Sequence, residues 1–426
     1  MNRTILVVFA LVYLGMILGR LPRLQLDRTG VALLGTLALL AAGAVSLDEA
    51  KAAVDTPTLG LLFAFMVLSA QLRLGGFYTR IVGEVTAREL SPELLLAAIV
   101  LTTGVLSAVF TNDVVCLAVA PLVIEASEHR RLDPVPFLLA LACASNVGSA
   151  ATLIGNPQNI LIGQRLGLSF GRYLIDAAVP AALGLAVIWA VVAYAYRGRF
   201  AASAEPESME TKRALRESPP ESAAHARPIG GPAPPWNAWQ ATKGVAVTTV
   251  LLAAFLATDW PREVVALGGA GVLLCSRRLH SRQMLGLVDW QLLVLFTGLF
   301  VVNHALESTG VMEDAVAALG SAGIDARDPT WLFGLISVLS NLVSNVPAVM
   351  LLLPLAEHPA SGAVLALAST LAGNLFVVGS IANIIVVDAA ARQGITIGWR
   401  QHARVGVPIT VATLAIAAAW LAMLHA

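Results

Sequence analysis

The chain has 426 residues, of which 57% are hydrophobic and only 13% are charged, and its mean hydropathy is +0.78. Soluble domains carry about 25% charged residues, so this composition excludes an ordinary soluble protein and predicts an integral membrane protein. Lys plus Arg and Asp plus Glu balance at 27 each, which leaves nucleic-acid binding without electrostatic support.

Apolar runs predict about ten full membrane spans, because a bilayer core of about 30 Å needs roughly 20 apolar residues in a helix. The first run, which begins at Ile5, has no cleavage site after it and is interpreted as a membrane helix rather than a signal peptide. The expected spans are 4–19, 29–46, 57–72, 135–163, 175–196, 243–258, 262–276, 289–306, 361–388 and 405–424.

Two further apolar runs, 92–125 and 329–357, are each broken in the middle by polar residues that favour helix starts. They predict two re-entrant hairpins. The spans 135–163 and 361–388 are also interrupted and predict broken transmembrane helices. Irregular backbone at that depth is tolerated only inside protein or around a wet cavity, because lipid cannot satisfy free N–H and C=O groups.

The chain also repeats itself. Residues 54–76 resemble 288–310, residues 107–121 resemble 340–354, and residues 155–162 resemble 379–386. An ordered internal repeat in so apolar a chain predicts a secondary transporter.

The distribution of Lys and Arg predicts the orientation of the chain. With the N-terminus outside, 21 of the 27 basic residues fall on the cytoplasmic side, and the second repeat is inverted relative to the first. The expected organisation is a first helix and cytoplasmic loop (1–28), repeat one (29–199), a disordered cytoplasmic linker rich in Pro, Ala, Glu and Ser (200–242), a connecting helix (243–261) and repeat two (262–426).

The four breaks are where we expect the solute site. Asn, Asp and Ser cap helices well, and each helix start presents free N–H groups and roughly half a positive charge. Several starts facing one cavity can hold an anion without Lys or Arg. The candidate solute ligands are Thr111, Asn112, Asn146, Gly148, Asn156, Asn159, Ser344, Asn345, Asn374, Gly379, Ser380 and Asn383.

Asp113 is the candidate for the coupling ion, because an acidic residue within the membrane is a functional candidate by default. It can coordinate a cation or exchange a proton, and its alternative role is that of a helix cap. Together with Asn112 and Asn146 it predicts a Na⁺ site, and Asn345 is a second candidate ligand for the coupling ion. No other cofactor is expected.

Cys116, Cys143 and Cys275 are isolated in apolar runs and are interpreted as small core hydrophobes. The chain has no P-loop and no serine, cysteine or zinc constellation, so we expect neither ATP hydrolysis nor any other enzymatic activity, and no ATPase subunit is evident. A channel is an alternative to a transporter, but it would more often show rings of polar or charged residues along a pore.

Four segments carry a family resemblance: LSAVFTNDVVCLAVAPLVI, ASNVGSAATLIGNPQNILIG, LSNLVSNVPAVMLLLPL and GNLFVVGSIANIIVVDAA. They resemble the ion-transporter superfamily, which includes divalent anion/sodium symporters, citrate transporters, arsenite permeases of ArsB type and NhaD-type antiporters. The likeness is greatest to a branch of bacterial inner-membrane anion permeases.

The resemblance implies an all-α polytopic fold of two inverted repeats, a homodimer, and an elevator-like movement in a bacterial inner membrane. It implies a small anionic solute, a carboxylate or an inorganic oxyanion, coupled to Na⁺ or H⁺. The tip Thr111-Asn112-Asp113 departs from the symporter pattern by gaining a carboxylate. An alternative function is therefore efflux of arsenite or antimonite driven by the proton gradient.

Overall fold

The computed structural model describes residues 2–19, 26–201 and 235–425, and within them the regular elements are helices, joined by turns and loops, with an isolated bridge between Leu132 and Ala201. The predicted all-α class is confirmed. The α-helices are α1 Asn2–Leu18, α2 Arg28–Ala41, α3 Leu47–Ala53, α4 Thr56–Leu74, α5 Phe77–Thr86, α6 Pro92–Val109, α7 Asn112–His129, α8 Pro134–Ser149, α9 Pro157–Arg165, α10 Phe170–Ala195, α12 Ala238–Ala257, α13 Arg262–Leu274, α14 Ser281–Leu285, α15 Trp290–Glu307, α16 Val311–Ser321, α17 Pro329–Val343, α18 Asn345–Leu352, α19 Ser361–Ala372, α20 Ile381–Ala391 and α21 Trp399–His425. Two 3₁₀ turns, η2 Leu353–Leu355 and η3 Val377–Gly379, follow α18 and precede α20.

Six of the described helices are long and apolar enough to cross a membrane: α4, α6, α10, α12, α15 and α21. Five of these fall on expected full spans, whereas α6 is the first arm of the expected hairpin 92–125. The remaining expected spans are formed by shorter helices, among them α1 with 17 residues, α2 with 14 and α13 with 13. At a rise of 1.5 Å per residue, 13 or 14 residues cover only about 20 Å. The region 135–163 contains α8 and α9, and the region 361–388 contains α19 and α20, each pair separated by non-helical residues.

Side-chain caps explain where many of the helices begin. Asp27, Asp55 and Asp328 each accept a hydrogen bond from a backbone N–H in the first turn of α2, α4 and α17. Ser46 and Glu49 form a reciprocal capping box at the start of α3. These caps satisfy N–H groups that have no partner within the helix.

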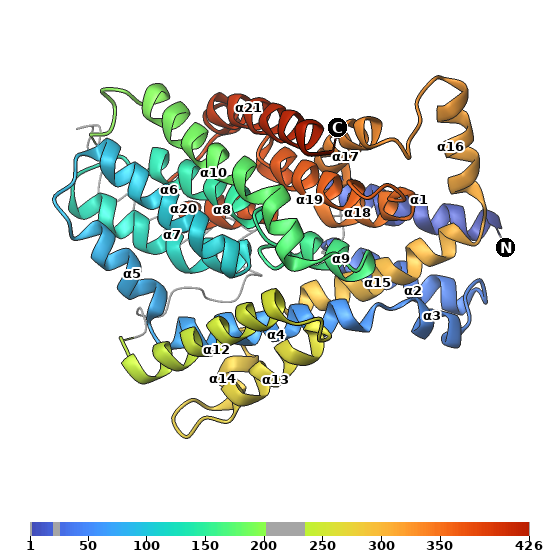
Figure 1. The fold of residues 1–426 in the computed structure, drawn as a ribbon, viewed down its shortest axis with the longest axis horizontal. Helices are drawn as coiled ribbons and strands as arrows, with labels where there is room; N and C mark the ends of the chain where they lie inside the picture. The colour runs from blue at the N-terminus through green and yellow to red at the C-terminus, as the bar shows by residue number, and fades with distance from the viewer. Residues whose placement is uncertain (1, 20–25, 202–234, 426) are drawn as a thin grey trace.

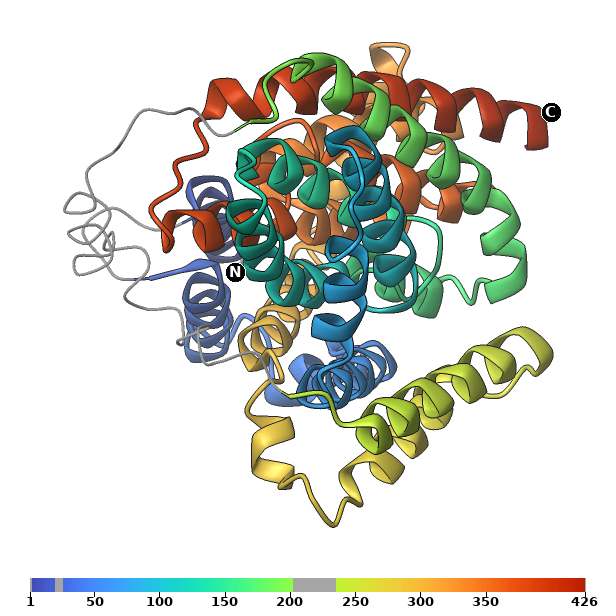
Figure 2. The same ribbon diagram turned by 90° about the vertical axis from the view of Figure 1, so that its left-hand side faces the viewer.

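The helices form two groups (Figures 1 and 2). In the first group α4 packs on α12 and α13, and α2 packs on α1 and α15. In the second group α8 packs on α6, α7, α10 and α20, and α19 packs on α17 and α21. The breaks before α7 and α20 therefore lie within the second group, where α18 packs on α17 and α19. Helix α9 packs on α18 and α19 and also on α4 of the first group, so it lies at the boundary between the groups.

Close helix packing within the second group depends on glycine. A Cβ atom added to Gly148 of α8 would lie 2.3 Å from the Gly104 carbonyl oxygen of α6. Backbone cannot yield as a flexible side chain can, so only glycine fits there. Gly148, a candidate solute ligand from sequence, thus has a packing role in the structure.

One helix boundary and the burial of one cysteine differ from the sequence-based expectations. Helix α12 begins at Ala238, within the expected linker 200–242, because the Asn237 side chain accepts the Gln240 N–H and caps the helix. Most of the expected linker, residues 202–234, lies outside the described residues. Cys116 and Cys143 are buried, but Cys275 is exposed at the end of α13, so its interpretation as a core residue is wrong.

Candidate functional site

One helix begins at each of the four breaks. Helix α7 begins after Thr111, α9 after Asn156, α18 after Ser344 and α20 after Ser380. The Asn156 and Ser380 side chains cap their own helices by accepting backbone N–H groups of Asn159 and Ala382. The residues before α7 and α18 make no such side-chain bond to the first turn of their helices.

The Asn146 amide, which is 1% exposed, is the centre of a polar network inside the second group. Its oxygen accepts from Asn112 Nδ2 at 3.1 Å and from Ser380 Oγ at 2.8 Å. Its nitrogen donates to Asn374 Oδ1 at 2.8 Å and to Asn383 Oδ1 at 3.1 Å. The network joins the start of α7 to the start of α20, although these segments are far apart in the sequence.

A second network joins α9 to α19. Asn156 Nδ2 donates to Thr370 Oγ1 at 3.2 Å, and Gln158 Nε2 donates to the same oxygen at 3.1 Å. Thr370 Oγ1 also lies 3.5 Å from Asn159 Oδ1. All four side chains are buried, so their polar groups depend on one another rather than on water.

The two networks are related by one numerical offset. Residues 146 and 156 become 370 and 380 when 224 is added, so the contact between Asn156 and Thr370 corresponds to the contact between Ser380 and Asn146. Tyr173 donates to the Ala150 carbonyl, and His402 Nε2 lies 3.0 Å from the Asn374 carbonyl. Residues 150 and 374 are also 224 apart, so these two side chains contact equivalent carbonyl groups in the two halves.

The starts of α7 and α18 also contact the other breaks. The Asn112 N–H donates to the Gly155 carbonyl at 2.9 Å, directly before the cap of α9. In the amide orientation that satisfies it, Asn345 donates to the carbonyls of Ser369 and Gly379 and accepts from Gln158 Nε2, at 3.1–3.2 Å. The four helix starts therefore belong to one connected polar region.

Ser344, at the start of α18, has an unusual backbone conformation with φ 77° and ψ 159°. This region of backbone space is almost exclusive to glycine, so a serine here is strained by about 1–3 kcal/mol. Strain of this kind concentrates at ligand sites and switch regions, where the surrounding structure enforces it.

Several buried polar atoms at these breaks have no hydrogen-bond partner among the described residues. They include the acceptor Asn112 Oδ1, the donor Asn374 Nδ2, and the hydroxyl groups of Ser107 and Thr111 at the α6–α7 break. Near α18 the same holds for the Ser340 hydroxyl and Asn341 Oδ1. Buried polar atoms without partners are rare, and each calls for a ligand or a functional explanation.

Asp113 lies in the first turn of α7, beside Asn112, and is partly exposed. Within the part of the chain that the structure describes, no hydrogen bond or ion pair joins its carboxylate to another group. Its neighbour one turn later, Cys116, donates to Ser145 Oγ at 3.0 Å. The Asp113 carboxylate is thus available to a ligand.

The structure brings the candidate asparagines and Ser380 into this connected region and adds residues that the sequence analysis missed. The additions are Thr370, Gln158, Tyr173 and His402. Thr370 could have been found from the repeat between 155–162 and 379–386, because its offset of 224 residues aligns Thr370 with the candidate Asn146. Tyr173 and His402 lie outside every sequence match. Among the described residues, the Ser344 and Thr111 side chains form no hydrogen bond in either network.

Comparisons with known proteins define the class. The sequence model of the citrate transporter family (CitMHS) matches residues 6–372. An uncharacterized transporter of Mycobacterium tuberculosis is 30% identical over 418 residues, which cover 93% of this chain and 94% of the relative. The rice silicon efflux transporter LSI3 (Oryza sativa subsp. japonica) is 30% identical over 466 residues, covering 96% and 95%.

A structural comparison agrees on the fold. The crystal structure of the YdaH transporter of Alcanivorax borkumensis, described as having an unusual topology, superposes with a TM-score of 0.56 at 14% identity, over 99% of this chain and 96% of that one. The protein is therefore an integral membrane transporter and not an enzyme. It belongs to the CitMHS citrate transporter family, within the ArsB/NhaD-type ion transporter superfamily.

Proposed function

We propose that this chain is a secondary active transporter of a small anion, a carboxylate or an inorganic oxyanion, across the bacterial inner membrane. The observation that carries the proposal is the pair of buried networks that joins the four helix starts. Helix starts supply N–H groups and partial positive charge without a counter-ion, which suits an anion that must bind and then leave.

The coupling ion is proposed to be Na⁺ or H⁺, bound at the start of α7. Asn112 Oδ1 and the hydroxyl groups of Ser107 and Thr111 are buried oxygens without a donor, and Asp113 adds a free carboxylate beside them. Neutral oxygens and a carboxylate are ligands for a hard cation, and the carboxylate alone can carry a proton. Asn374 Nδ2, an unused donor in the same network, would face the anion.

The proposed movement is an elevator in which the second helix group carries the solute past the first. In support, the hydrogen bonds of both networks join α7, α8, α9, α19 and α20 to one another, so they are kept if these helices move together. The proposal includes two inverted repeats, with the N-terminus outside, and a homodimer. A molecular mass measured by light scattering in detergent would test the dimer.

The test of function is solute uptake by purified protein in liposomes. Citrate, sulfate and phosphate would be offered with and without a Na⁺ gradient, at pH 6 and pH 8. Asn146→Ala removes the side chain that joins two helix starts and is expected to lower uptake at least about 100-fold, because it leaves several buried groups unpaired. Thr249→Ala, which removes an exposed hydroxyl bonded only within α12, is the matched control.

Unchanged uptake in Asn146→Ala would refute the assignment of the site. Absence of uptake of every anion would refute the proposed substrate class. The second candidate, efflux of a small uncharged metalloid hydroxy acid such as arsenite or antimonite, is favoured by the silicon efflux transporter among the relatives. Metalloid efflux that requires Asn146, and that is not inhibited by the anions, would favour this second candidate.

A further inference from the structure

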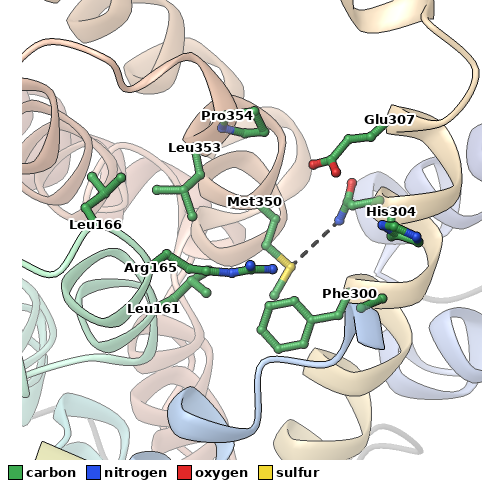
Figure 3. A pocket seen from close by; sticks show the side chains of 11 residues that line it. Leu161, Arg165, Leu166, Phe300, His304, Glu307, Met350, Leu353 and Pro354 are labelled. Atoms are coloured by element: carbon green, nitrogen blue, oxygen red, sulfur yellow. Dashed lines mark hydrogen bonds between the residues drawn. The ribbon is translucent and has the colours of Figure 1, made fainter. Parts of the chain in front are cut away.

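A cavity of about 230 Å³ lies apart from the two networks, between the two helix groups (Figure 3). One wall is the last part of α9 with Arg165, and the facing wall is α15 with Phe300, His304 and Glu307. Met350 of α18 lines it from the third side. The cavity thus has a boundary in both groups and would change shape if one group moved past the other.

The Arg165 guanidinium lines this cavity and is paired with a carboxylate through its Nε atom. Its Nε lies 3.0 Å from Asp55 Oδ2, and its guanidinium carbon lies 5.6 Å from the centre of the Phe300 ring. Figure 3 shows the side chain extended over Phe300 toward Met350. The Nη groups have no hydrogen-bond partner in the described residues, and the side chain is 46% exposed. Two parallel N–H donors therefore face the cavity, the arrangement that binds a carboxylate or oxyanion bidentately.

Asp55 does not depend on Arg165 for its place in the fold. Its Oδ1 accepts the Thr58 N–H at 2.9 Å and caps α4, where the helix start also favours a negative charge. A ligand could therefore take the guanidinium from Asp55 without leaving that carboxylate unpaired. Arginine, in contrast, would exchange one anionic partner for another.

The bond between Arg165 and Asp55 also connects the two helix groups. Beside it, Gln164 Nε2 donates to Glu263 Oε2 at 3.0 Å, and Arg262 donates to the Leu168 carbonyl. All three contacts tie the end of α9 to the starts of α4 and α13, in the first group. Loss of the ion pair would weaken this connection at one end of the molecule.

We propose that this cavity is a docking site for the transported anion, in which a carboxylate or oxyanion binds the free Nη groups of Arg165, competes with Asp55 for the guanidinium and so loosens α9 from α4. The proposal rests on the proposed transport of anions. Glu307 faces the same space and opposes the charge of the ligand, so the site binds weakly and releases the anion readily. The volume is sufficient for a small anion.

The experiment uses a cysteine reporter in the cavity wall. Leu353→Cys would be labelled with a membrane-impermeant maleimide in a Cys275→Ser background, since the two remaining native cysteines are buried. Citrate and sulfate are the probes. Each is expected to slow labelling in a concentration-dependent manner. Arg165→Gln should raise the half-protecting concentration at least about 10-fold, and Glu307→Gln should lower it.

Arg172→Gln removes an exposed arginine outside the cavity and is the control for net charge. Arg165→Lys keeps the positive charge but not the two parallel N–H donors of the guanidinium, so it should show intermediate protection. Protection that is unchanged in Arg165→Gln, or absent with both probes, overturns the docking site. Asn146→Ala should abolish uptake and retain protection, which separates failure of the docking site from failure of the transport site.

Discussion

Asn159 and Asn383, which are 224 residues apart, make the same hydrogen bonds in the two halves of the chain. Asn159 Nδ2 donates to the carbonyls of Ser149 and Thr152 at 3.4 and 2.9 Å, and Asn383 Nδ2 donates to those of Gly373 and Phe376 at 2.9 and 3.2 Å. Each asparagine thus satisfies carbonyl groups that the preceding helix leaves free at its break.

We expect Asn159→Ala and Asn383→Ala to destabilise the protein to a similar extent. Each substitution leaves two carbonyls without this donor, at about 1–3 kcal/mol for each group that is buried and unsatisfied. Thermal unfolding of the purified protein in detergent would measure the effect, with Gln283→Ala, an exposed amide, as the control. A large effect in one variant and none in the other would contradict the equivalence of the two sites.

Asp113→Asn is expected to remove the dependence of transport on the coupling ion. The amide keeps the size and the oxygen of the side chain but neither binds a proton nor carries charge. Uptake by the variant should no longer respond to the pH gradient or to the Na⁺ gradient, whichever drives the native protein. Asp48→Asn, on an exposed pair with Lys51, is the control. A variant with native responses to both gradients would exclude Asp113 from coupling.

Gly148→Ala is expected to lower stability by about 1–3 kcal/mol or more, because the added methyl group meets the Gly104 backbone at 2.3 Å. Gly268→Ala is the matched control, since a Cβ atom there meets nothing within 4 Å and alanine favours the helix. Thermal unfolding and the yield of folded protein would be compared. Equal behaviour of the two variants would show that α6 and α8 are not packed at this distance.

Ser344→Gly should stabilise the protein by about 1–3 kcal/mol, because glycine adopts the observed φ of 77° without strain. If the hydroxyl contacts the solute, the same variant should show weaker transport with a raised KM. Unfolding and uptake would be measured on one preparation. A loss of stability would mean that the serine conformation is not strained in the folded protein.

The amino-acid sequence was sufficient for the class of the fold and the position of the breaks in its helices. Composition excluded a soluble domain, and the caps Asn156 and Ser380 stand where the repeat between 155–162 and 379–386 placed helix starts. These features are local, since capping and hydrophobic length are properties of neighbouring residues. For the same reason Asn237 could move the start of α12 into the expected linker.

Only the tertiary structure decided which residues meet. The sequence could align Asn146 with Thr370. It could not show that Asn146 bonds to Ser380, the cap of α20, or that Thr370 bonds to Asn156, the cap of α9. It suggested Gly148 as a ligand, whereas the structure places it against the Gly104 backbone. The pairing of Arg165 with Asp55 had no signal in the sequence. Such contacts depend on how helices distant in the chain pack, and packing is a property of the whole molecule.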